Sequence, residues 1–158
     1  MKKLIFLLFI ILCSYSFAQI QSFDSTHIEG LKNDLVGTYK EIVKQSITMT
    51  GEQSKIFWPL FDDYMKARNP IFEERVSVTE EYMLNYYSLD DETGKNILNR
   101  AMQLSQELLD VRKEYINKMM EQLPVPVVGK FFQVDNRVTI ALDMIRMSST
   151  PLVREEER

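Results

Sequence analysis

Pairs of neighbouring carboxylates are the strongest candidates for catalytic or metal-binding groups in this 158-residue chain. Neighbouring carboxylates can act as a general acid and base, or can bind a divalent cation. The runs are Asp62-Asp63, Glu73-Glu74, Glu80-Glu81 and Asp90-Asp91-Glu92. Because Lys66, Arg68 and Arg75 lie among them, we interpret these charges as the solvated face of a helix, with weak divalent-metal binding as the alternative.

Other catalytic groups are scarce. His27 is the only histidine and Cys13 the only cysteine, so a histidine-based or thiolate site lacks ligands. The sequence contains neither a glycine-rich phosphate loop nor a nucleophile elbow. We therefore predict no enzyme activity and no catalytic, cofactor-binding or metal-binding residue.

The first 18 residues have the pattern of a cleaved signal peptide. Lys2 and Lys3 precede an apolar run over residues 4–12, and small and polar residues lead to Ala18. The run is too short to span a membrane, which takes about 20 residues. We expect cleavage after Ala18 and a periplasmic protein.

A lipoprotein signal that uses Cys13 is the alternative, but Leu12 stands where such signals carry a small residue. Cleavage removes Cys13, so no disulfide can form within the exported chain. It also removes two of the 19 basic residues, leaving 17 against 23 acidic residues and a net charge of -6. That charge argues against nucleic acid as a partner.

The remaining chain, about 140 residues long, has the length of one domain and reads as amphipathic helices. Residues 28–47 predict a first helix. Thr50 and Gln53 have the spacing of a capping box that begins a second, running to about Tyr87. Pro59 should kink this second helix, and Asn69-Pro70 marks either another kink or a cap with a new helix start.

A turn over residues 88–93 separates the second helix from the next. Asp90 is a natural N-cap, and the helix it begins should run to about Glu121. Its apolar residues alternate spacings of four and three, as in a coiled-coil seam. The seam comprises Ile97, Ala101, Leu104, Leu108, Val111 and Tyr115, and Leu98, Met102, Leu109, Ile116 and Met120 widen it.

Pro124 and Pro126 end that helix, and a last helix should span about Val127 to Met147. No segment has a convincing strand pattern. The prediction is therefore an all-α fold of four or five helices built on a long kinked hairpin. Residues 19–147 form the single helical domain, and residues 148–158 form a polar, mobile tail.

The order of these features resembles the periplasmic Spy/CpxP family, which is known for its L-T-x-x-Q motif. Met49-Thr50-Gly51-Glu52-Gln53 matches this motif at Thr50 and Gln53, with Met49 in place of leucine. The second copy would fall at residues 123–127, where Leu123 matches while Pro124 and Val127 replace the threonine and the glutamine. The segments FWPLFDDY, SLDDET and KFFQVDNRV look closer to related, uncharacterised small envelope proteins.

The resemblance spans about residues 28–153 and implies both a fold and a function. It implies long helices, a homodimer with a concave cradle, and ATP-independent holding of unfolding envelope proteins or a role in envelope stress. Aromatic and methionine side chains would bind such clients, and the candidate client-binding residues are Phe57, Phe61, Phe131 and Phe132. The alternative for most of the aromatic positions is a core, and the alternative function is an adaptor for one dedicated envelope partner.

Overall fold

The computed structural model describes residues 38–148 and 150–153, all within the unit Thr38–Arg158. The predicted signal peptide, Cys13, His27 and the first part of the predicted helix 28–47 lie outside the described residues. So do residues 149 and 154–158 of the predicted tail.

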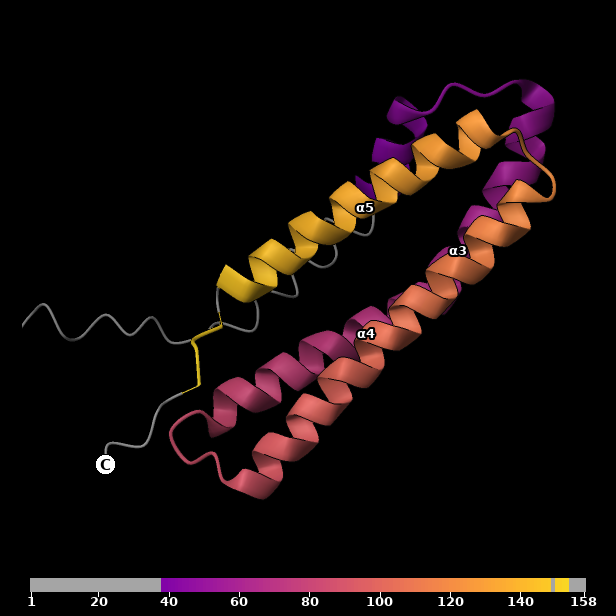
Figure 1. The fold of residues 1–158 in the computed structure, drawn as a ribbon. Helices are drawn as coiled ribbons and strands as arrows, with labels where there is room; N and C mark the ends of the chain where they lie inside the picture. Colours follow the sequence, from indigo (N-terminus) through magenta and orange to yellow (C-terminus); the bar gives the residue numbers. More distant parts are fainter. Residues whose placement is uncertain (1–37, 149, 154–158) are drawn as a thin grey trace, which may run out of the picture. The chain divides into compact units, whose positions relative to one another are not determined.

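Helices make up the described part of the chain, and no strand occurs there (Figure 1). A helical segment over residues 38–46 leads to α3 (Gly51–Asn85), α4 (Asp91–Met120) and α5 (Val125–Ser148). The all-α prediction is confirmed. None of the described helices is both long and apolar enough to cross a membrane.

The predicted capping box begins α3. The Gln53 backbone N–H donates to Thr50 Oγ1 over 3.2 Å, and the Thr50 N–H donates to Gln53 Oε1 over 3.0 Å. These bonds satisfy two donors that would otherwise lack a partner at the end of the helix.

Both prolines lie inside the single helix α3. The alternative of a new helix start at Asn69-Pro70 is therefore wrong. Pro59 and Pro70 are exposed, and the carbonyls that lose a partner belong to the exposed Lys55 and Lys66. Water can bind these carbonyls, which explains how the helix tolerates two prolines.

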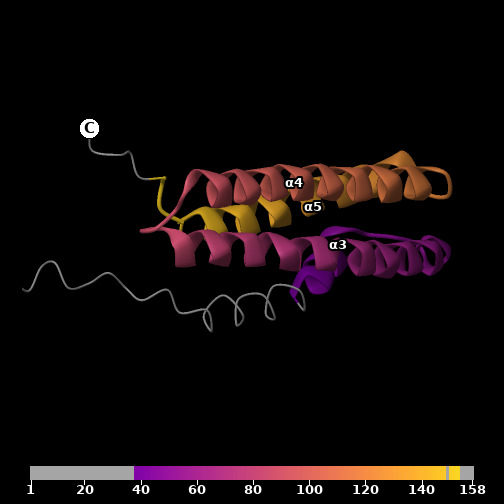
Figure 2. The ribbon, with the colours of Figure 1, turned by 90° about the horizontal axis from the view of Figure 1, so that it is seen from below.

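The two longest described helices, α3 and α4, lie side by side as an antiparallel hairpin (Figures 1 and 2). Asp90 caps α4 as predicted, since its Oδ1 accepts the Thr93 N–H over 2.7 Å. The predicted seam is buried at Ile97, Leu104 and Leu108. Ile97 and Leu104 join Val78 and Tyr82 of α3 in one apolar cluster.

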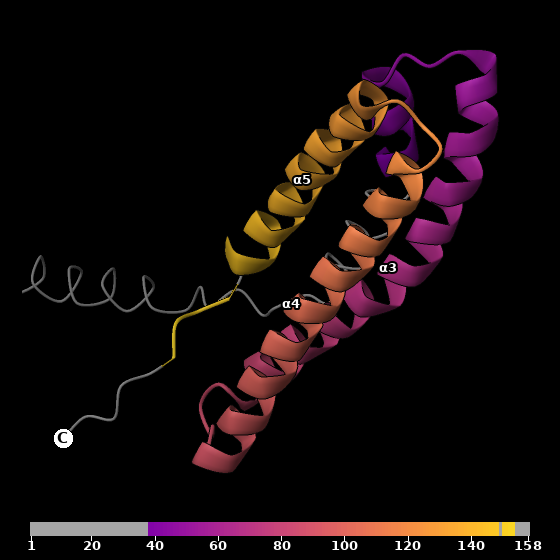
Figure 3. The same ribbon diagram turned by 45° about the vertical axis from the view of Figure 1, so that its right-hand side comes forward.

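Helix α5 returns from the end of α4 (Figure 3). It begins at Val125, two residues before the predicted start, because the Pro124 carbonyl accepts the Val127 N–H over 2.9 Å. Pro126 then lies in the first turn, where its missing N–H costs little. Beyond α5, the carbonyl of Pro151 accepts the Tyr82 hydroxyl over 3.0 Å, so this part of the predicted mobile tail contacts α3.

Thr50→Ala should lower the free energy of unfolding by about 1 kcal/mol, because it removes the acceptor for the Gln53 N–H. Urea denaturation followed by circular dichroism measures the change. Thr48→Ala is the matched control, since Thr48 is exposed in the loop before the cap. Equal midpoints for the two variants would show that the cap contributes nothing.

Candidate functional site

Three of the four candidate client-binding phenylalanines lie together in the core. Phe57 and Phe61 of α3 and Phe131 of α5 are at most 1% exposed. The ring of Phe131 lies edge-on to Phe57, with centroids 5.5 Å apart, and edge-on to Phe61, at 5.9 Å. Such edge-to-face pairs add to the stability gained from burial.

Phe132 is the exception, because 44% of it is exposed. Phe57, Phe61 and Phe131 are therefore core residues, which was the alternative to client binding. They offer no surface to a client in this conformation. Of the four candidates, Phe132 alone is accessible to a partner.

A carboxylate is buried beside these rings. Asp135 of α5 is 1% exposed and lies on the apolar stripe of that helix, four residues after Phe131 and three before Val138. The hydroxyls of Tyr39 and Tyr64 both donate to its Oδ1, over 2.6 and 2.7 Å.

One arginine pairs with this carboxylate, and a second lies against the ring of Tyr39. Arg112 Nε of α4 lies 2.7 Å from Asp135 Oδ2, although its N–H is not aligned for a hydrogen bond. Arg68 of α3 is 1% exposed, and its guanidinium lies 5.5 Å from the Tyr39 ring centroid and 5.6 Å from that of Phe72. These are cation–π distances.

The prediction that Arg68 lies on a solvated helix face is therefore wrong. Its Nε and Nη2 are buried without a hydrogen-bond partner. The physical reason is its position on the apolar stripe of α3, four residues after Tyr64 and four before Phe72. Neighbouring acidic pairs are surface residues as expected: Asp62 pairs with Lys40, and Asp63 with Lys66.

We call Tyr39, Tyr64, Arg68, Arg112 and Asp135 the Asp135 cluster. Its members come from the segment 38–46, α3, α4 and α5, so the cluster joins all four helical elements. Burial, and then the negative charge of Asp135, raise the pKa of Tyr39 and of Tyr64. Both phenols therefore stay neutral donors at physiological pH. This arrangement is suited to holding helices together rather than to acid–base catalysis.

Metal ligands do not gather in the part of the chain that the structure describes. No group of three or more histidine, cysteine, aspartate or glutamate side chains is placed there to hold an ion. Glu74 and Glu81 instead pair with the same arginine, Arg100.

An exposed apolar stripe runs along α4. Leu98, Met102 and Leu109, which we call the α4 stripe, are 59%, 56% and 53% exposed. The sequence predicted that they would widen the apolar seam, and that prediction is wrong for these three residues and for Met120, which is 47% exposed. Each residue of the α4 stripe lies one position after a seam residue, so it is turned about 100° around the helix from that residue.

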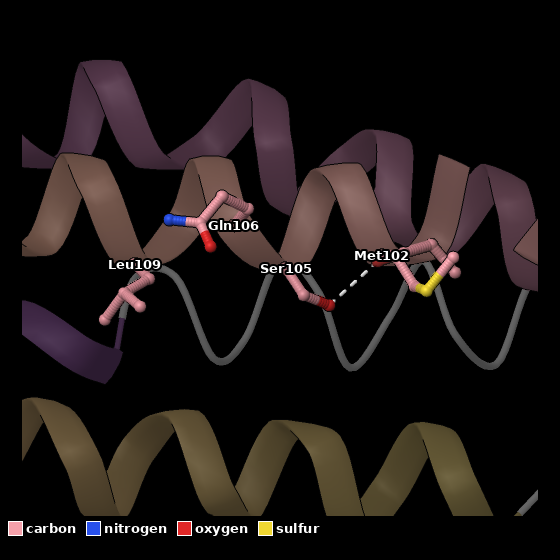
Figure 4. Close-up of a pocket in the computed structure, with 5 residues that line it drawn as sticks. Met102, Ser105, Gln106 and Leu109 are labelled. Carbon is pink, nitrogen blue, oxygen red and sulfur yellow. Dashed lines mark hydrogen bonds between the residues drawn. The ribbon is translucent and has the colours of Figure 1, made fainter. Parts of the chain in front are cut away.

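A shallow groove of about 430 Å³ lies along two residues of the α4 stripe, Met102 and Leu109. Figure 4 shows Met102, Ser105, Gln106 and Leu109 along its wall, with the Ser105 hydroxyl donating to the Ala101 carbonyl over 2.8 Å. Helix α5 carries a second exposed apolar row at Ile140, Met144 and Met147. These leucine, isoleucine and methionine side chains are the candidate binding surface.

Neither the burial of Asp135 nor the exposed α4 stripe was predicted from the sequence. For Asp135 a signal existed, because a carboxylate occupied an apolar-stripe position of a predicted helix. For the stripe no such signal existed, since its residues have the same apolar character as the seam beside them.

Comparisons with protein-family models, with curated proteins and with solved structures found no match. The resemblance to the Spy/CpxP family therefore stays a prediction from sequence pattern.

Asp135→Asn should lower the free energy of unfolding by about 3–5 kcal/mol, because the largely buried Arg112 loses its counter-charge. The urea midpoint measures this loss. Asp110→Asn is the matched control, an exposed carboxylate on α4 whose replacement should change stability by less than about 0.5 kcal/mol. A similar small effect at both positions would contradict the role of the cluster.

Alkaline pH should destabilise the fold. Tyrosine ordinarily titrates near about pH 10, whereas Tyr39 and Tyr64 keep their protons above that value in the folded state. Above about pH 10 the unfolded chain then binds fewer protons than the folded one, so the free energy of unfolding falls as the pH rises. Urea midpoints together with tyrosinate absorbance test this, and ionisation of all tyrosines near their ordinary pKa without unfolding would contradict it.

Proposed function

We propose that this protein is an ATP-independent, chaperone-like binding protein of the bacterial envelope. It holds apolar segments of partly unfolded polypeptides on the α4 stripe. The observation that carries this proposal is the exposure of more than half of Leu98, Met102 and Leu109 beside a groove.

These side chains are exposed although the protein has a buried apolar core. The aromatic rings and the α4 seam are already buried, so the stripe is additional apolar surface. Contiguous exposed apolar surface is typical of interaction sites, because it gains free energy when a partner covers it. Methionine suits varied partners, since its unbranched side chain adapts to different shapes.

The charge of the chain supports the same function. After the predicted cleavage its net charge is -6, which keeps a protein and its bound client in solution. The sequence has no phosphate loop, so the proposed binding uses no nucleotide. The predicted signal peptide and the resemblance to the Spy/CpxP family support a periplasmic location for this proposed activity.

The purified protein should suppress aggregation of several unrelated denatured proteins at near-stoichiometric ratios without a cofactor. Light scattering of the client measures this. The double variant Met102→Gln/Leu109→Gln should lose most of the suppression, because it makes the groove wall polar. Phe132→Gln tests the accessible phenylalanine in the same assay.

The matched control is Leu84→Gln/Val153→Gln, which alters two other exposed apolar residues outside the groove. Circular dichroism and urea midpoints must show that both double variants keep the fold. Equal suppression by the two double variants would rule out the α4 stripe as the client site. Failure with every client, together with capture of one tight partner, would favour the dedicated adaptor.

A further inference from the structure

A small pocket lies where α3, α4 and α5 meet. Arg75 and Thr79 of α3, Ser105 of α4 and Arg146 of α5 line it, and its volume is about 60 Å³. A water molecule needs roughly 10–15 Å³ of such volume. The pocket therefore has room for about four oxygen-sized atoms, the number in a phosphate or sulfate ion.

The pocket carries donors that the protein does not fully satisfy. Arg146 Nε is buried without a hydrogen-bond partner. The other contacts of that guanidinium are long, at 3.4 Å from Nη1 to Thr79 Oγ1 and 3.4 Å from Nη2 to Asp143 Oδ1. Hydrogen bonds normally measure about 2.7–3.2 Å, so this cation has unused capacity to donate.

Two hydroxyls complete the polar wall. The Thr79 hydroxyl donates to the Arg75 carbonyl over 3.0 Å, and the Ser105 hydroxyl donates to the Ala101 carbonyl. Both carbonyls belong to the preceding helical turn, so each hydroxyl can rotate toward the pocket without exposing a backbone group.

The arginine and aspartate side chains at the pocket carry a net positive charge, which favours binding of an anion. Arg75 and Arg146 line the pocket with side chains that are 11% and 27% exposed, and both pair with the same carboxylate, Asp143. Among the described residues, this leaves an excess of one positive charge at the pocket. Burial is the largest cause that lowers the pKa of Arg75. Asp143 opposes this effect, and the positive charge of Arg146 adds to it. An unpaired charge in this setting is costly unless an anion joins it.

We propose that this pocket binds a small tetrahedral oxyanion, phosphate or sulfate, on Arg75 and Arg146. The ion would accept from Arg146 Nε and from the guanidinium of Arg75, and it would join α5 to α3. Its charge would offset the excess positive charge at the pocket. This inference does not depend on client binding.

Calorimetric titration of the purified protein in low-salt buffer tests the proposal, with inorganic phosphate and sulfate as probes and chloride at equal ionic strength as the blank. Phosphate or sulfate should bind saturably with one site per chain and raise the melting temperature, and chloride should not. Vesicles of phosphatidylglycerol, with phosphatidylcholine as their blank, distinguish a lipid phosphate from the free ion as its source.

Arg146→Gln should weaken oxyanion binding about tenfold, because a charged donor is lost. Arg137→Gln is the matched control, since it removes the same charge from an exposed position of α5 and should leave binding unchanged. Ser105→Val should also abolish binding by filling the pocket while keeping every arginine, which keeps the test decisive if Arg146→Gln fails to fold. The proposal is overturned by absence of saturable binding, by chloride acting as well as phosphate, or by equal weakening in Arg137→Gln.

Discussion

The buried carboxylate of Asp135 is the interaction on which the helix arrangement depends. It accepts hydrogen bonds from the hydroxyls of Tyr39 and Tyr64, and it pairs with Arg112. A carboxylate in an apolar interior is stable only when such partners compensate for its lost hydration. All of these partners must therefore face α5 at one point. This requirement fixes how α5 lies against the other helices, which apolar contacts alone specify less strictly.

This constraint also explains why the α4 stripe is exposed. Arg112 lies three residues after Leu109 on the same side of α4, and it reaches α5 through Asp135 and through a 2.9 Å hydrogen bond to Thr139. Farther along, α5 makes polar contacts with α3 instead, by the 2.9 Å pair of Arg75 with Asp143. Polar side chains of the second half of α5 thus reach α3, and the residues that line the groove along α4 all belong to α4 itself.

Local features of the fold were predictable from the sequence, because their causes are local. The capping box at Thr50, the N-cap at Asp90 and the proline stop at Pro124 all depend on residues within one helical turn. The burial of Asp135 and Arg68 was not predicted, since we interpreted charged helix residues as solvated. The sequence identified the seam of α4, but it could not tell that the neighbouring apolar row would stay exposed, because that depends on packing with α3 and α5.

The proposed function requires that partly unfolded clients contact the α4 stripe of an intact helical fold. Site-specific photo-crosslinking tests this requirement, with a photoreactive residue placed at Met102 or, as the control, at Leu84 of α3, which is more exposed than Met102. If the α4 stripe is the client site, a denatured client is crosslinked from position 102 and not from position 84. Equal crosslinking from both positions, or crosslinking from position 84 alone, would contradict it.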